Sequence, residues 1–311
     1  MTACVGDLIK YYRKEKGISQ EKLAEEAGCT REYIGKLEKN KNSPTIETLA
    51  LIAQKLNVDL FDAYSEINEY NNFEIALKVK MLSDAMGRRD VDRIVSLVSS
   101  YSGDEGFKTG NPSKVLLYAK AIIISTVYKD NQKAIECIYK ALCEEYQEFP
   151  SFKSVPLRLS NIEFTLLFAY GGLLQRIKKY DEAEVIFEEI LERLKRLLEK
   201  EGYESEKRRF FWLNLYCSCT YNMVIYSNKS PQILIKKVDT VLDYQKKNKR
   251  ANMLAELSLA KALLLKKNGQ EKEYRTNLQI ARGLGKFYWG DEAYTKFEQA
   301  VARQFNIEIL E

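Results

Sequence analysis

The stretch that decides the fold is Ile18-Ser19-Gln20-Glu21-Lys22-Leu23-Ala24, followed by Ala27-Gly28-Cys29-Thr30-Arg31-Glu32-Tyr33-Ile34-Gly35-Lys36-Leu37-Glu38. Ser19 and Thr30 each precede a run with helical apolar spacing, and such side chains accept hydrogen bonds from the first turn of a helix. Gly28 lies between the two runs, where a tight turn needs a residue that tolerates left-handed backbone. The spacing predicts two short helices joined by a turn, as in a DNA-binding helix-turn-helix.

Three more helical segments are expected around this pair. Residues 5–16 place Val5, Leu8, Ile9 and Tyr12 on one face, and the pattern leaves Arg13, Lys14 and Lys16 exposed. Thr45 follows the loop 40–44 and caps a fourth helix, and residues 57–59 open a short fifth segment. A five-helix unit over residues 1–65 is therefore predicted. A small helical bundle without a DNA role would have the same spacing.

Charge does not choose between these two interpretations. The chain of 311 residues has a net charge of +5, but residues 1–65 contain ten Lys and Arg against ten Asp and Glu. A strongly basic domain would have favoured DNA binding on charge alone. The DNA-binding hypothesis therefore depends on the residue pattern.

The composition argues against several classes of function. The chain has no histidine, which removes the commonest general base and the commonest metal ligand. It has no GxxxxGK[ST] loop for phosphate, and its six cysteines match no zinc pattern. We expect a binding protein that is not an enzyme and needs no metal or cofactor. With no apolar run of membrane-spanning length and no signal-peptide pattern, a cytoplasmic location is expected.

After a predicted linker at residues 66–72, helical periodicity continues through residues 73–311. The clearest unit is residues 164–198, where Gly171, Ala183 and Phe187 have the separations of a tetratricopeptide repeat. The small residue at 171 predicts a close approach of the paired helix. Glu189–Arg193 and Glu192–Arg196 are expected as ion pairs on the solvent face. About five helix pairs are predicted, with a terminal helix near 291–306 that caps the stack, so the whole chain is expected to be all-α.

The N-terminal run closely resembles the Cro/C1-type phage repressor family. That resemblance implies that Gln20 holds a phosphate and braces the recognition helix, while Arg31 and Glu32 face base edges in the major groove. It also implies that Thr30 contacts phosphate as well as capping its helix. Further contacts to the DNA backbone are implied for Lys36, Asn40 and Lys41.

The combination of the two parts resembles the peptide-pheromone regulators of Gram-positive bacteria, the Rgg/PlcR/ComR/PrgX group. The resemblance implies a right-handed superhelical repeat domain that binds a short signalling peptide on its concave face and forms a homodimer. It also implies a double-stranded DNA operator as partner.

Asparagine on the first helix of each pair suits peptide capture, because its amide can donate to and accept from one peptide unit. The proposed peptide contacts are Asn161, Tyr170, Gln175, Asn214 and Asn222. Arg176, Trp212, Tyr216 and Asn252 lie on the same expected inner surface. Packing between repeats is the alternative role for each of them. For the whole chain the alternatives are a repeat scaffold that binds a partner protein, and a repressor without a peptide ligand.

Overall fold

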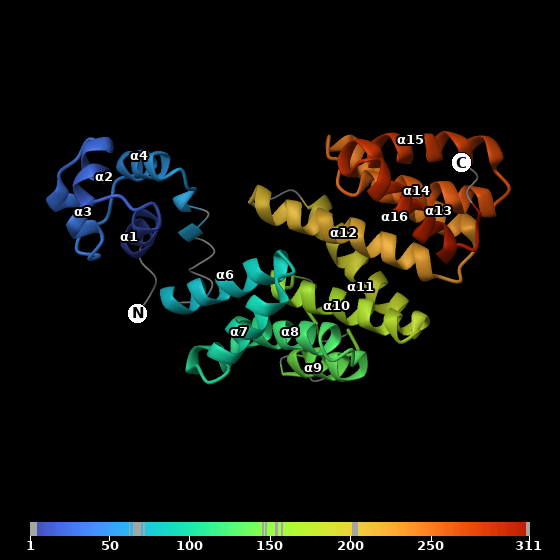
Figure 1. Ribbon diagram of the computed structural model, residues 1–311, viewed down its shortest axis with the longest axis horizontal. Coiled ribbons are helices and arrows are strands. Elements are labelled where there is room, and N and C mark those ends of the chain that lie inside the picture. The colour runs from blue at the N-terminus through green and yellow to red at the C-terminus, as the bar shows by residue number, and fades with distance from the viewer. Residues whose placement is uncertain are drawn as a thin grey trace. The chain divides into compact units, whose positions relative to one another are not determined.

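The computed structural model describes residues 5–61, 63–64, 70, 72–144, 146, 148–152, 155–156, 158–200 and 205–308. Every regular element in these ranges is helical, so the predicted all-α class is confirmed. The chain divides into two compact units, Met1–Ile123 and Ile124–Glu311 (Figure 1). None of the helices in the described ranges combines the length and apolar composition that crossing a bilayer requires.

The first unit begins with four helices that start where the sequence predicts them. They are α1 (Val5–Glu15), α2 (Gln20–Glu26), α3 (Arg31–Leu37) and α4 (Ile46–Leu56). The predicted caps are present, since Ser19 Oγ accepts from the Lys22 amide at 3.0 Å and Thr30 Oγ1 from the Tyr33 amide at 3.2 Å. Gly28 has a φ of +66°, which lies in the left-handed region. The turn between α2 and α3 therefore favours glycine, which has no Cβ to clash in this conformation.

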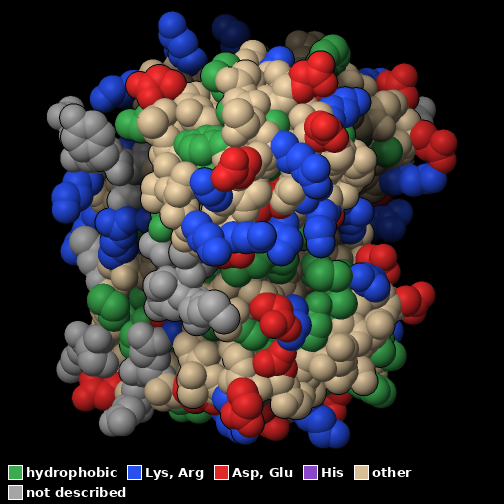
Figure 2. All heavy atoms as spheres, turned by 90° about the vertical axis from the view of Figure 1, so that its left-hand side faces the viewer, with side chains coloured by type: hydrophobic (Ala, Val, Ile, Leu, Met, Phe, Trp, Pro, Cys, Tyr) green, Lys and Arg blue, Asp and Glu red, His purple; other side chains and the backbone are tan. Residues whose placement is uncertain are grey.

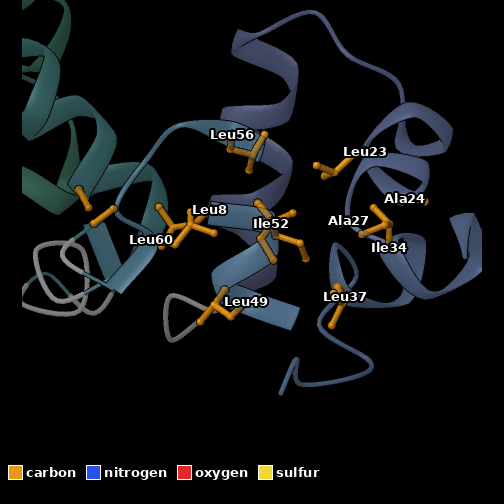
Figure 3. Close-up of a cluster of buried hydrophobic side chains, with 13 residues drawn as sticks. Leu8, Leu23, Ala24, Ala27, Ile34, Leu37, Leu49, Ile52, Leu56 and Leu60 are labelled. Carbon is orange, nitrogen blue, oxygen red and sulfur yellow. The ribbon is translucent and has the colours of Figure 1, made fainter. Parts of the chain in front are cut away.

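One hydrophobic cluster holds these helices together (Figure 3). Leu8, Ile34 and Ile52 from α1, α3 and α4 have no exposed surface, and complete burial of such a side chain stabilises a fold by roughly 1.5–3 kcal/mol. Ala76 belongs to the same cluster, and Phe73 packs against it. The beginning of the next helix, α6 (Phe73–Gly87), is thus part of this core.

The rest of the first unit contains α6, α7 (Val91–Tyr101), a 3-10 helix η1 (Glu105–Phe107) and most of α8 (Gly110–Thr126). Residues 66–69 and 71 of the predicted linker lie outside the described residues. Asn72, the last linker residue, caps α6 by accepting from the amides of Glu74 and Ile75. The domain boundary at residues 66–72 stays a prediction.

The second unit continues with α9 (Asn131–Cys143), α10 (Asn161–Arg176), α11 (Tyr180–Glu199), α12 (Glu206–Tyr226), α13 (Pro231–Lys247), α14 (Leu254–Lys267), α15 (Glu271–Trp289) and α16 (Asp291–Gln304). In the first unit α6 packs on α7, and in the second unit α10 packs on α11, α12 on α13 and α14 on α15, with α16 following α15.

The packing of α10 on α11 confirms the expectation for Gly171. A Cβ at this position would lie 2.9 Å from the Phe187 ring, so only glycine allows the two helices to approach this closely. The expectation for Arg193 is wrong. Its side chain still pairs with Glu189, at 2.7 Å, but it is 7% exposed and also donates to the carbonyls of Pro156 and Phe152. These carbonyls lie 37 and 41 residues before Arg193 in the sequence. A helical wheel compares only residues of the same helix, so it could not have predicted these contacts.

Gly6 provides a test of the packing of α1. A Cβ there would lie 1.9 Å from the Leu37 carbonyl oxygen, which belongs to the backbone and cannot move aside. We expect Gly6→Ala to lower the free energy of unfolding by roughly 1–3 kcal/mol, as other overpacked cores do. Thermal and urea melts followed by circular dichroism would measure the change.

Gly87→Ala is the matched control, because a Cβ at Gly87, which also lies in a helix of the first unit, meets nothing within 4 Å. It should leave stability unchanged or raise it slightly. Equal melting curves for the two variants would contradict the close approach of α1 to the end of α3.

Candidate DNA-binding surface and ligand-binding face

The helix α3 presents its first turn to solvent and its opposite face to the core. Arg31 and Glu32 are exposed, whereas Ile34 and Leu37 are buried. Figure 2 looks onto the side of Figure 1 where α1 to α4 lie and shows Lys and Arg interspersed with Asp and Glu. This mixture agrees with the balanced composition of residues 1–65.

A buried charged network fixes α2 and α3 relative to α1. Arg13 Nε lies 2.5 Å from Glu38 Oε1, Arg13 Nη2 donates to Glu38 Oε2 at 3.0 Å, and Gln20 Nε2 donates to the same oxygen at 2.7 Å. Arg13 Nη1 also donates to the Ile18 carbonyl at 2.7 Å. The expectation that Arg13 is exposed is wrong, since its side chain is 11% exposed and that of Glu38 is 2% exposed.

Sequence analysis missed Glu38, although a signal for it was present. Glu38 lies four residues after Ile34 and Arg13 four residues after Ile9, so each charged residue occupies the buried face of its helix. A charged group is stable there only if it is paired. Two such positions of opposite charge in neighbouring helices predict a buried ion pair.

The balance of effects on Glu38 favours its ionised form. Burial by itself raises the pKa of the Glu38 carboxyl, but the hydrogen bonds from Arg13 and Gln20 and the charge of Arg13 outweigh burial and lower it. The same contacts raise the pKa of Arg13. The ion pair therefore persists at neutral pH and keeps the Gln20 amide oriented.

Gln20 and Arg31 meet at the junction of the two helices. With Arg13, Ser19 and Glu21 they line a hollow of about 350 Å³ on the surface. Gln20 thus lies beside the start of α3, as a residue that braces the recognition helix must. The side chain of Arg31 is exposed and forms no hydrogen bond or ion pair within the described part of the chain, which leaves it available to a ligand.

The other predicted DNA contacts are arranged around α3. Glu32 Oε1 pairs with Lys36 Nζ at 2.8 Å, and this exposed pair lowers the pKa of the Glu32 carboxyl. Asn40 has a φ of +54° and donates to Asp7 Oδ2 at 3.0 Å. Lys41 is exposed, and Thr30 caps α3. All seven predicted residues thus lie on or next to α2, α3 and the turn after α3, and their contact with DNA stays a prediction.

Of the residues expected on the inner surface, the aromatic ones are buried in the packing, whereas Asn161 and Arg176 are exposed. Tyr170 is buried, with its ring 5.2 Å from that of Phe149, and Trp212 and Tyr216 are also buried. Asn161 is exposed at the start of α10. Arg176 is exposed and donates to Ser125 Oγ at 2.7 Å.

The amide side chains form two contacts between neighbouring elements. Gln175 Nε2 of α10 donates to the backbone carbonyl of Asn222 in α12 at 3.0 Å, and the Asn222 side chain donates to Ser218 in its own helix. Asn252 Nδ2, just before α14, donates to Asn214 Oδ1 of α12 at 2.6 Å. The structure brings Gln175 to Asn222 and Asn214 to Asn252, and their role in peptide binding stays a prediction.

A hollow of about 520 Å³ lies between α11, α12 and α13, and among the predicted residues Tyr216 lines it. Its carboxylates already have cationic partners. Glu188 lies 2.7 Å from Lys229 and 3.2 Å from Lys237, and Glu189 is paired with Arg193. These closed ion pairs leave the hollow with little unpaired charge to attract a ligand.

Comparison with known proteins shows what the two parts are similar to. Residues 9–62 match the family model described as helix-turn-helix. The HTH-type transcriptional regulator SinR of Bacillus subtilis (strain 168) is 35% identical over 85 residues, which cover 26% of this chain and 77% of SinR.

Two solved structures are similar along nearly the whole chain. Bacillus thuringiensis PlcR, in complex with the peptide PapR7 and DNA, has a TM-score of 0.54 and 15% identity over 96% of this chain and 98% of PlcR. A candidate transcriptional regulator of Listeria monocytogenes EGD-e has a TM-score of 0.57 and 12% identity over 98% and 99% of the two chains. These matches show that the fold is shared.

Replacing Glu38 by glutamine tests the buried network. The variant leaves the Arg13 charge buried without a carboxylate, and breaking a buried ion pair by removing one partner costs about 3–5 kcal/mol. We expect this loss in the urea-induced unfolding of Glu38→Gln. Glu32→Gln is the control, because it removes the same charge from an exposed pair in the same helix and should change stability little.

The same variant has a predicted pH signature. Because the pKa of Glu38 is lowered on folding, its stabilisation is fully present above its ordinary value of 4.5 and is lost as pH falls through the folded-state pKa. The free energy of unfolding of the wild type should therefore fall below that pH more steeply than that of Glu38→Gln. Parallel curves would show that Glu38 is not ionised in the folded protein.

Proposed function

Because the chain belongs to the helix-turn-helix transcription regulators, we propose that a short signalling peptide bound by its repeat helices controls its binding to DNA. The observation that supports the DNA-binding part most directly is the exposed first turn of α3, held from behind by the Glu38 network. The peptide part is supported by the shared fold with PlcR, whose solved complex contains a peptide and DNA.

In this proposal Arg31 and Glu32 read base edges in the major groove. A guanidinium can donate two hydrogen bonds to guanine, and a carboxylate can accept from cytosine N4. Glu32 exchanges its Lys36 partner for a base, which leaves Lys36 free to contact a phosphate. Gln20, Thr30, Asn40 and Lys41 hold the sugar-phosphate backbone around this contact.

One recognition helix reads few base pairs, so we propose that two copies bind a palindromic operator. The half-sites are then one helical turn of DNA apart, about 34–36 Å, or a multiple of that distance. The proposed dimer joins the two copies through the repeat helices.

The proposed peptide contacts come from the side-chain amides on the first helices of successive pairs. Asn252 donates a hydrogen bond to Asn214 in the structure. A peptide unit could take the place of this bond, because its N–H can donate to Asn214 Oδ1 and its carbonyl can accept from Asn252 Nδ2. Gln175 instead holds the backbone of α12 in place and acts on the site through Asn222.

The base-reading role of Arg31 can be tested on duplexes selected from random DNA. Arg31→Ala should weaken binding to the selected operator by roughly 1–3 kcal/mol, with little change in the salt dependence. Lys41→Ala should weaken operator and random DNA alike and reduce the salt slope by about one contact. Fluorescence anisotropy at several salt concentrations would measure both. An equal loss for Arg31→Ala on operator and random DNA would show that Arg31 reads no base.

The peptide hypothesis can be tested with pools of short synthetic peptides, measured by calorimetry and by their effect on operator affinity. Some pools should bind and change operator affinity. Asn214→Ala should weaken peptide binding about tenfold or more, because an unpaired amide costs roughly 1–3 kcal/mol.

Asn248→Ala is the matched control, since Asn248 is exposed and donates to a carbonyl at the end of its own helix, α13. Its peptide affinity should equal that of the wild type. The absence of binding by any pool, together with a stable complex with a second protein, would favour the scaffold interpretation and refute the peptide hypothesis.

A further inference from the structure

An aromatic cluster joins three helices of the second unit. Phe297 of α16 stacks against Tyr221 of α12, with ring centroids 6.4 Å apart and planes inclined by 24°. Trp289, at the end of α15, meets Phe297 edge-on at 4.9 Å, and Tyr294 of α16 lies 6.1 Å from Phe297. Tyr221 and Phe297 are half-buried and Trp289 is 40% exposed, so the cluster reaches the solvent.

The carboxylate of Glu256, in the first turn of α14, lies beside this cluster. Burial raises the pKa of Tyr221, and the charge of Glu256 is the next largest cause of that rise. For Tyr294, burial and Glu298 contribute more, and Glu256 contributes as well. Met253, three residues before Glu256, contacts Ser218, three residues before Tyr221. Because both helices advance equally over three residues, Glu256 is brought to the side of α12 that carries Tyr221.

Among the described residues, half-buried Glu256 has no Lys or Arg in an ion pair with it, unlike two other carboxylates of this unit. Glu298 pairs with Arg282 at 2.8 Å, and Glu184 lies 2.6 Å from Lys229. Burial raises the pKa of the Glu256 carboxyl, and its own backbone amide offsets this only in part.

Two contacts place the cluster on the face that carries the predicted peptide contacts. Along α12, Asn214 meets Asn252, and Ser218 Oγ lies 3.2 Å from Met253 Sδ. Residues 214, 218 and 221 are spaced by four and three, so they form one stripe of α12 that faces the start of α14. Two helical turns, about 10 Å, separate Asn214 from Tyr221.

We propose that Glu256, together with the rings of Tyr221 and Phe297, receives a positively charged group of the signalling peptide. An ammonium or guanidinium over an aromatic face is attracted by the ring, and the attraction grows when the cation is desolvated. The Glu256 carboxylate supplies the opposite charge. This inference rests on the proposed peptide function and adds the chemical class that the peptide presents.

The geometry also gives the spacing of the peptide groups. An extended chain advances about 3.3 Å per residue, so 10 Å corresponds to roughly three residues. The cationic group is therefore expected about three residues from the peptide unit that Asn214 binds. The group is either the peptide's amino terminus or a Lys or Arg side chain.

Peptide pools that differ only in charge distinguish these sources. Each pool carries Lys, Arg or uncharged norleucine at one fixed position, with a free or an acetylated amino terminus. We expect the wild type to bind pools with the preferred cation about tenfold more tightly than their uncharged equivalents. Loss of affinity on acetylation identifies the amino terminus, whereas a preference for Lys or Arg that survives acetylation identifies a side chain.

Glu256→Gln should abolish this preference and still bind the uncharged pools with wild-type affinity. Glu206→Gln is the control, since Glu206 also lies in the first turn of its helix, α12, but is fully exposed, and it should keep the preference. Phe297→Leu, which leaves the carboxylate in place, should reduce the preference severalfold.

The outcomes separate this inference from the proposed function. A wild type that binds peptide pools without regard to charge overturns the role of Glu256 and leaves the peptide function standing. A wild type that binds no pool overturns the peptide function itself. Because the preference is measured on the wild type, the inference stays testable even if a variant fails to fold.

Discussion

The burial of one apolar face of each helix against its neighbours is the constraint on which the whole structure depends. The helix α14 shows this most clearly, because residues 257–260 and 262–265 are all buried, so a single partner helix could not cover it. Gly171 shows how tight this packing is, because the Phe187 ring occupies the space of its missing side chain. Such stacking leaves α10 next to α12 and α12 next to α14.

In the first unit, the same constraint is met with an ion pair inside the packed helices. Arg13 and Glu38 lie on the buried faces of their helices, and a buried ion pair is seldom the most stable choice there. Here the ion pair serves to orient the helices relative to one another. The Glu38 carboxylate holds Gln20 from α2 and Arg13 from α1 at the same time, so α2 and α3 keep the angle at which the start of α3 is exposed.

Local chemistry made much of this fold predictable from the sequence. The starts of α2, α3 and α4 follow from Ser19, Thr30 and Thr45, since each cap bonds only a few residues away. The terminal helix near 291–306 follows from helical periodicity in the same way.

Features that depend on distant partners were not predictable in that way. Arg13 was expected in solvent, but its partner lies 25 residues away, and Arg193 reaches carbonyls 37 and 41 residues away. The carboxylate beside Tyr221 was also missed, because its neighbours come from α12 and α16. Periodicity identifies the buried face of a helix but not what faces it.

The last helix, α16, has a second consequence beyond closing the stack. Its residues Tyr294 and Phe297 form one wall of the aromatic cluster, while Tyr221 of α12 and Trp289 of α15 form the others. A molecule bound there touches the folded arrangement of all three helices and cannot bind when α16 is detached. By linkage, its binding free energy is added to the stability of that end of the chain and grows with the logarithm of its concentration. Under the proposed peptide binding, α16 would thereby convert the amount of ligand into resistance of this end of the repeat helices to local unfolding.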